Sequence, residues 1–230
     1  AVEQRLTSKQ FCHNIVLNER GINHMQVKKI TSGLAQENGY VLEKEGSVVI
    51  IDPGTDDPRF FEVIDRLGTP AAILLTHAHF DHIGGVDALR ERYEVPVYVH
   101  RLESDWLTNG EKNGAAAFNL PVPAMKPAEK VYEGDTLTIG NFTFHLYHTP
   151  GHSPGSVVLY MADEGIAFCG DLIFKQSVGR TDLFGGDQAT LMGSIDRMKH
   201  LIPGATVLYP GHGPKTTLEE EKQTNPFFKQ

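Results

Sequence analysis

Six consecutive residues carry a high density of side chains that can hold a metal ion. His77-Ala78-His79-Phe80-Asp81-His82 places three imidazoles and one carboxylate in a single short stretch. Imidazole and carboxylate groups are good ligands for zinc, iron and manganese. The alternative is that Asp81 caps a helix while the histidines are exposed loop residues, but three histidines at this spacing favour a metal site.

Three later segments each offer one more group of the same kind. His152 lies in HTPGHSPGS, Asp171 ends IAFCGD, and His212 lies in YPGHGP. Glycines and prolines make rigid turns there, and glycine lets the backbone approach an ion closely. Each segment alone is a weak signal. Together with the first motif they indicate one shared site.

The elements that must position these groups follow from the hydrophobic pattern. The apolar run 71–75 predicts a buried strand that leads directly into the first motif. The region 102–130 has no clear period and is expected to be a partly helical insertion. The interleaving of strands and helices predicts a mixed α/β fold. Further strands are expected over 26–31, 39–43, 47–52, 95–100, 156–161, 166–170 and 205–209, a hairpin over 130–139 and 142–148 with a turn at Gly140-Asn141, and helices over 58–67, 85–93, 187–201 and 218–224.

Composition narrows the class of protein. Of the 230 residues, 40% are hydrophobic and 22% are charged, and these fractions are typical of a globular protein. Its formal net charge of -8 disfavours nucleic acid as a partner, and no apolar run approaches the roughly 20 residues that cross a bilayer. We expect a cytoplasmic protein without membrane contact. Residues 1–24 precede Met25 and are expected to be an extension left by an expression vector, with 25–230 forming one domain.

The order H-x-H-x-D-H, His, Asp, His resembles the signature of the metallo-β-lactamase superfamily. The resemblance implies a four-layer αββα sandwich with a site at the shared edge of two sheets. It also implies two divalent metal ions, zinc with iron or manganese as alternatives, and catalytic roles for Asp81 and Asp171. On this basis Asp52 orients a ligand imidazole, unless it only forms the turn before Pro53. The implied ligands are His77, His79 and His152 for the first metal, Asp81, His82 and His212 for the second, and Asp171 for both.

The stretch 170–183 and the closing Glu221-x-x-x-Asn225-Pro226-Phe227 resemble the glyoxalase II branch of this superfamily. The resemblance implies hydrolysis of a small-molecule thioester such as S-lactoylglutathione by a hydroxide that two metals share. Full-length members carry a C-terminal helical domain, and this chain stops before one, so we expect a short single-domain form. Class B β-lactamases with a cysteine ligand have it where Asp171 stands, and Cys169 is expected to be a buried strand residue.

Several alternatives stay open at this level. A persulfide dioxygenase with one iron resembles the same branch, and a lactonase, another ester hydrolase or a non-enzymatic metal-binding protein would use the same fold. Arg180 is expected to bind a substrate carboxylate, or else to pair with Asp182. Trp106, Phe118 and Met125 in the irregular segment are a hypothetical pocket wall. The oligomeric state is not predicted.

Overall fold

Two six-stranded sheets form the centre of the computed structural model, which describes residues 25–121 and 125–229. The expected vector-derived extension, 1–24, lies outside these residues. The first sheet has the order β1 (Gln26–Ser32), β2 (Glu37–Lys44), β3 (Ser47–Ile51), β4 (Thr69–Leu74), β5 (Val97–Val99) and β6 (Lys130–Val131). The second has the order β14 (Thr216–Thr217), β13 (Val207–Pro210), β10 (Ile166–Gly170), β9 (Val157–Met161), β8 (Phe142–His148) and β7 (Thr136–Ile139).

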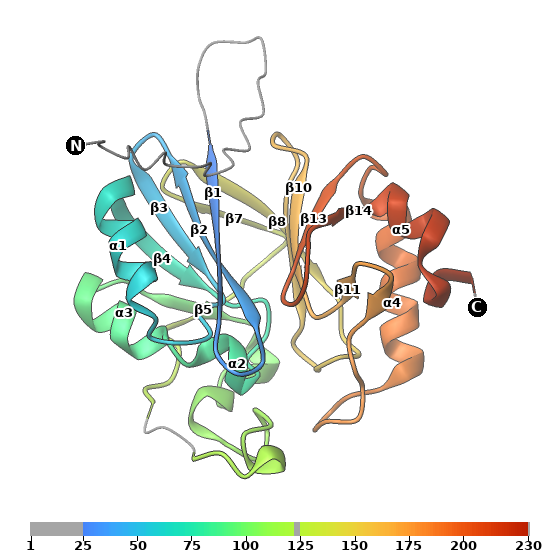
Figure 1. Cartoon of the computed structure of the whole chain (residues 1–230), viewed down its shortest axis with the longest axis horizontal. Helices are drawn as coiled ribbons and strands as arrows, with labels where there is room; N and C mark the ends of the chain where they lie inside the picture. Colours follow the sequence, from blue (N-terminus) through green and yellow to red (C-terminus); the bar gives the residue numbers. More distant parts are fainter. Residues whose placement is uncertain (1–24, 122–124, 230) are drawn as a thin grey trace, which may run out of the picture.

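Helices cover the outer face of each sheet, which confirms the predicted four-layer αββα sandwich. The helices α1 (Pro58–Leu67) and α3 (Val86–Tyr93) pack on the first sheet, and α4 (Gln188–Leu201) and α5 (Leu218–Thr224) pack on the second (Figure 1). The short helix α2 (Phe80–Ile83) lies at the edge where the two sheets meet (Figure 1). The remaining elements are the hairpin β11 (Ile173–Phe174) and β12 (Ser177–Val178) and the 3-10 turns η1 (Arg101–Glu103), η2 (Trp106–Thr108), η3 (Ala116–Phe118) and η4 (Pro226–Lys229).

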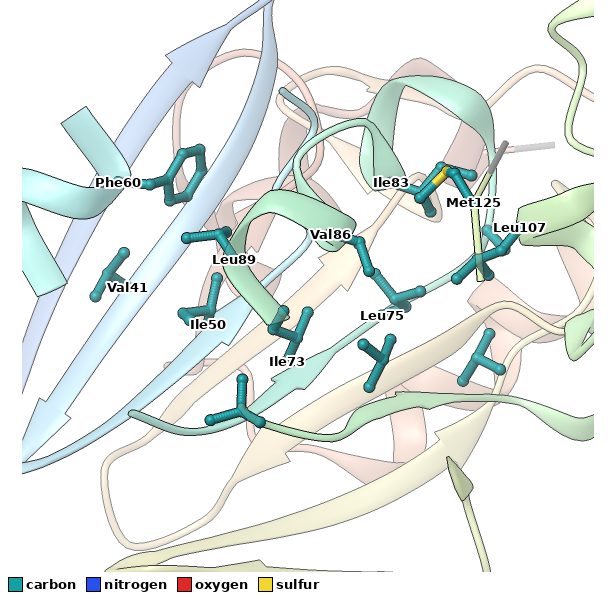
Figure 2. Close-up of a cluster of buried hydrophobic side chains, with 14 of the residues drawn as sticks. Val41, Ile50, Phe60, Ile73, Leu75, Ile83, Val86, Leu89, Leu107 and Met125 are labelled. Carbon is teal, nitrogen blue, oxygen red and sulfur yellow. The ribbon is translucent and has the colours of Figure 1, made fainter. Parts of the chain in front are cut away.

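Alternate residues of the central strands serve two different cores. Successive side chains of a strand point to opposite faces, so a strand buried on both faces reads as a continuous apolar run. In β3, Ile50 packs under α1 and α3 with Phe60 and Leu89 (Figure 2), while Val49 packs between the two sheets. The residues 48–51 are therefore all apolar because both faces of the strand are covered.

One part of the predicted element pattern needs correction. The expected strand 130–139 is two strands in different sheets, because β6 pairs with β5 whereas β7 pairs with β8. The chain crosses between the sheets around Gly134, which has a positive φ of 67°. The hairpin turn at Gly140-Asn141 is confirmed, as is the irregular character of 102–130, whose described part contains the end of η1 and the 3-10 turns η2 and η3. Among the described residues, no helix is long and apolar enough to span a bilayer.

Candidate metal centre

The groups singled out in the sequence gather at the edge where the two sheets meet. The strand β4 runs into Thr76 and His77, and α2 follows with Asp81 and His82. The second sheet supplies the others from the loop between β8 and β9, from the residue after β10, and from the turn after β13. Both halves of the chain are therefore needed to complete the cluster.

Three imidazoles form a tight buried group. The Nδ1 atom of His79 lies 2.8 Å from Nε2 of His152, which lies 3.2 Å from Nε2 of His77. Tetrahedral zinc with nitrogen ligands would hold such atoms roughly 3.3 Å apart. These three nitrogens are thus close to the spacing that one metal ion requires, and they form one of the groups able to hold an ion.

A second group shares a carboxylate with the first. The Nε2 atom of His212 lies 3.3 Å from Oδ2 of Asp81, and Nε2 of His82 lies 3.4 Å from Oδ1 of Asp171. The other oxygen of Asp171 lies 3.5 Å from Nε2 of both His152 and His212. Asp171 is therefore placed between the two groups.

Unpartnered atoms at this edge fit divalent cations. Nε2 of His82 and Oδ1 of Asp171 are buried without a hydrogen-bond partner among the described residues. An unsatisfied buried polar atom is costly, and a bound cation would satisfy both. A Cβ atom on Gly211 would lie 2.2 Å from Oδ1 of Asp171, so glycine is needed for this close approach. The fold and this cluster together imply divalent metal ions.

The side chains of Asp52 and Thr76 hold two of the imidazole rings through their Nδ1 atoms. Asp52 Oδ2 accepts hydrogen bonds from Nδ1 of His82 at 3.1 Å and from the Thr76 hydroxyl at 2.5 Å. The Thr76 hydroxyl in turn accepts from Nδ1 of His77 at 3.1 Å. When an ion is bound, each ring keeps its one proton on Nδ1 and uses the Nε2 atom as the ligand. Asp52 is thus placed to orient an imidazole.

Backbone carbonyls orient two further rings. Nδ1 of His152 donates to the carbonyl of Arg180 at 2.7 Å, and Nδ1 of His212 donates to the carbonyl of Ala35 at 3.1 Å. No sequence pattern indicates these partners, because any residue type supplies a carbonyl. Sequence reasoning also missed Thr76 and the buried carboxyl of Glu37, whose Oε1 lies 3.8 Å from Nδ1 of His82. Burial raises the pKa of Glu37 well above its usual range.

The two groups differ in protonation. Burial lowers the pKa of His77 and His152, and lowers that of His79 to about 3, so these rings are neutral at pH 7. Burial also acts to lower the pKa of His212, but hydrogen bonds to Asp171 and Asp81 outweigh it and raise that pKa to about 10. The carboxylates that favour a proton there would equally favour a divalent cation in its place.

The other residues singled out have more varied surroundings. The Arg180 side chain pairs with Asp182, with Nε 2.6 Å from Oδ1, and lies over the ring of Phe118 at 5.6 Å.

Cys169 is a buried strand residue, as predicted, and burial raises the pKa of its thiol to about 12. A thiol at this pKa is a poor metal ligand because the thiolate is the form that binds.

The hypothesis that the irregular segment forms a pocket wall is wrong for two of its three residues. Trp106 and Met125 are buried in the core between the first sheet and its helices. Trp106 nevertheless reaches the cluster from inside, with its ring 5.7 Å from that of His79. Only Phe118 is open to solvent, with 45% of its surface exposed.

Two sheets between helical layers, with imidazoles and carboxylates at their common edge, define a class of metal-dependent hydrolases. The chain belongs to the metallo-beta-lactamase superfamily, whose family model matches residues 32–212.

Individual relatives agree with this assignment. A probable metallo-hydrolase of Bacillus subtilis, YqgX, is 42% identical over 206 residues, covering 89% of this chain and 98% of the relative. The hydroxyacylglutathione hydrolase GloC of Haemophilus influenzae is 32% identical over 208 residues, with 89% and 98% covered. The chain is therefore similar along most of its length to metallo-hydrolases.

Solved structures extend the likeness to three dimensions. The BLEG-1 B3 metallo-beta-lactamase superposes with a TM-score of 0.86 at 45% identity, covering 89% of this chain and 100% of that one. TTHA1623 in a di-iron-bound form has a TM-score of 0.79 at 41% identity, with 87% and 100% covered. Proteins at 41% and 45% identity to this chain thus share its fold, and one of them was solved with two iron ions bound.

Proposed function

We propose that the protein hydrolyses a small-molecule thioester such as S-lactoylglutathione with two divalent metal ions, zinc in the native protein. His77, His79 and His152 would hold one ion, Asp81, His82 and His212 would hold the other, and Asp171 would serve both. The observation that carries the proposal is the position of Asp171, with Oδ2 3.5 Å from an imidazole nitrogen of each group. The similarity to GloC supports the thioester as substrate class.

When bound, two such ions would supply a water-derived nucleophile near neutral pH and Lewis-acid polarisation of a carbonyl group. The two groups of ligand side chains differ in exposure, and this difference decides from which side a substrate can approach. The imidazoles of the first group are almost fully buried, whereas the side chains of Asp81 and His212 are 17% and 27% exposed. A substrate therefore approaches from the side of the second group. The thiolate that leaves has a thiol pKa of about 8.5 and needs little protonation.

The experiment combines metal analysis with an anaerobic assay. We expect two metal ions per chain and cleavage of S-lactoylglutathione without oxygen, lost on chelation and regained on adding metal. One iron per chain with oxygen consumption that depends on a persulfide would overturn the proposal. The proposal would also be overturned if the protein cleaved a simple lactone and not the thioester, or if it cleaved neither compound.

Hydrolysis of a β-lactam is the second candidate function. The similarity to the BLEG-1 B3 metallo-beta-lactamase favours it. The two reactions require the same nucleophile but a different leaving group, an amine in place of a thiolate. A β-lactam assayed beside the thioester on the same preparation therefore separates them, and faster β-lactam turnover would favour this candidate.

Arg180 is proposed to bind a carboxylate of the substrate, and its replacement gives a directional prediction. Arg180→Ala is expected to raise KM for an anionic thioester about five-fold, since an exposed ion pair contributes up to about 1 kcal/mol. The metal content and kcat should not change, because the carbonyl of residue 180 still accepts from His152.

The matched control is Asp182→Ala, which removes the present partner of the guanidinium. It should leave KM unchanged or lower it, because Arg180 is then free for substrate. An equal rise of KM in both variants would indicate that the pair only stiffens the loop.

A further inference from the structure

Glu103, the last residue of η1, is a fully buried carboxylate close to the first imidazole group. Its Oε2 atom accepts a hydrogen bond from the backbone N–H of Ala78 at 2.6 Å. Its Oε1 atom accepts from the backbone N–H of Gly155 at 2.7 Å and from the hydroxyl of Ser153 at 2.5 Å. No motif in the sequence marks this residue, because it lies in the segment without a clear period.

The partners of Glu103 belong to two different ligand loops. Ala78 stands between His77 and His79 in the loop after β4, which belongs to the first sheet. Ser153 follows His152 directly and lies, like Gly155, in the loop between β8 and β9 of the second sheet. One side chain therefore ties together the two loops that carry the three imidazoles.

We infer that Glu103 is a positioning residue that sets the spacing between His152 and the pair His77 and His79, and so tunes the affinity of the first metal position. The inference rests on the ligand assignment of the proposed function. It needs no contact between Glu103 and the ion, because the carboxylate acts through the backbone of both loops.

The chemistry of the contacts requires a carboxylate. All three partners donate, so both oxygens of Glu103 must accept. A glutamine would turn its amide N–H2 towards either Ala78 N–H or Gly155 N–H and leave that buried donor without a partner. Gly155 is also fitted to this side chain, since a Cβ atom there would lie 2.8 Å from Cγ of Glu103.

The chain offers a matched control in Glu221, a second fully buried glutamate. It accepts from the Thr216 hydroxyl at 2.6 Å, from Gln176 N–H at 2.8 Å and from the Asn225 side chain at 2.8 Å. These contacts tie α5 to the β11–β12 hairpin and touch no ligand loop directly. Replacing Glu221 therefore disturbs a comparable buried network away from the imidazoles.

The experiment titrates the metal-free full chain with Co²⁺ alone and follows its visible absorption spectrum. For Glu103→Gln we expect the affinity of the first position to fall roughly ten-fold or more, the usual effect of losing an outer partner of a metal site. We also expect the Co²⁺ spectrum at saturation to change, because the three nitrogens no longer keep their spacing. Glu221→Gln should bind Co²⁺ with wild-type affinity and spectrum.

Wild-type affinity and spectrum in Glu103→Gln would overturn the inference, as would an equal loss in Glu221→Gln. If Glu103→Gln does not fold, Ser153→Ala removes one donor and leaves both backbone contacts. It should give a smaller loss in the same direction, and no loss would overturn the inference.

Two further measurements separate this inference from the proposed function. A wild-type chain that binds fewer than two Co²⁺ ions, or a His79→Ala variant with wild-type affinity, would show that the ligand assignment itself is wrong. Two bound ions in the wild type together with an indifferent Glu103→Gln would overturn only the positioning role.

Discussion

Replacing Asp171 by alanine is expected to reduce thioester hydrolysis by roughly a thousand-fold, because several kcal/mol of transition-state stabilisation by metal ions is at stake. Asp171 is the one carboxylate within 3.5 Å of imidazole nitrogens in both groups among the described residues. Its loss also leaves His82 Nε2 without its acidic neighbour. The measurements are kcat/KM for S-lactoylglutathione and metal content per chain, which should fall below two.

Cys169→Ala is the control for this prediction. Cys169 is buried two residues before Asp171, and its thiol donates to the carbonyl of Ile173 instead of facing the imidazoles. This variant should keep both metal ions and most of the activity. Two ions retained in Asp171→Ala, or one lost in Cys169→Ala, would contradict the bridging role and point to the sulfur.

The parts of the site that were predictable from the sequence are those whose chemistry belongs to side chains in a motif. His77, His79 and His82 could be recognised because three imidazoles in six residues are rare without a ligand role. The carbonyls of Ala35 and Arg180, which hold the outer nitrogens of two rings, could not, because only the folded chain places them. Glu103 was missed for a related reason, since one glutamate in an irregular segment has no pattern.

The fold could be predicted from the sequence for strands that are buried on both faces. The continuous apolar runs at β3 and β4 follow from burial on both sides, and both were correctly expected to be strands. The division of 130–139 between two sheets was not predictable, because alternation indicates which face is buried but not which sheet covers it. The burial of Trp106 was likewise decided by packing against distant residues.

Removal of the metal ions is expected to lower the melting temperature markedly. At a free metal concentration 1,000-fold above Kd, binding contributes about 4 kcal/mol to folding, and for a chain of this size that corresponds to about 8–16 °C. The structure gives a physical reason for so large a change. Asp52, Asp81 and Asp171 converge on one edge together with the buried carboxyl of Glu37, and without cations their charge must be balanced in another way.

Protons on His82 and His212 provide that balance only in part. Burial opposes a proton on His82, yet the charges of Asp171 and Asp81 raise its pKa well above the usual range. Two imidazolium charges replace four charges of two divalent ions, so the carboxylates remain less well compensated. Thermal unfolding with and without a chelator measures the effect, and restored metal should restore the melting temperature. His79→Ala should show a smaller chelator shift, whereas an unchanged melting temperature in the chelated wild type would mean that the cluster is stable without ions.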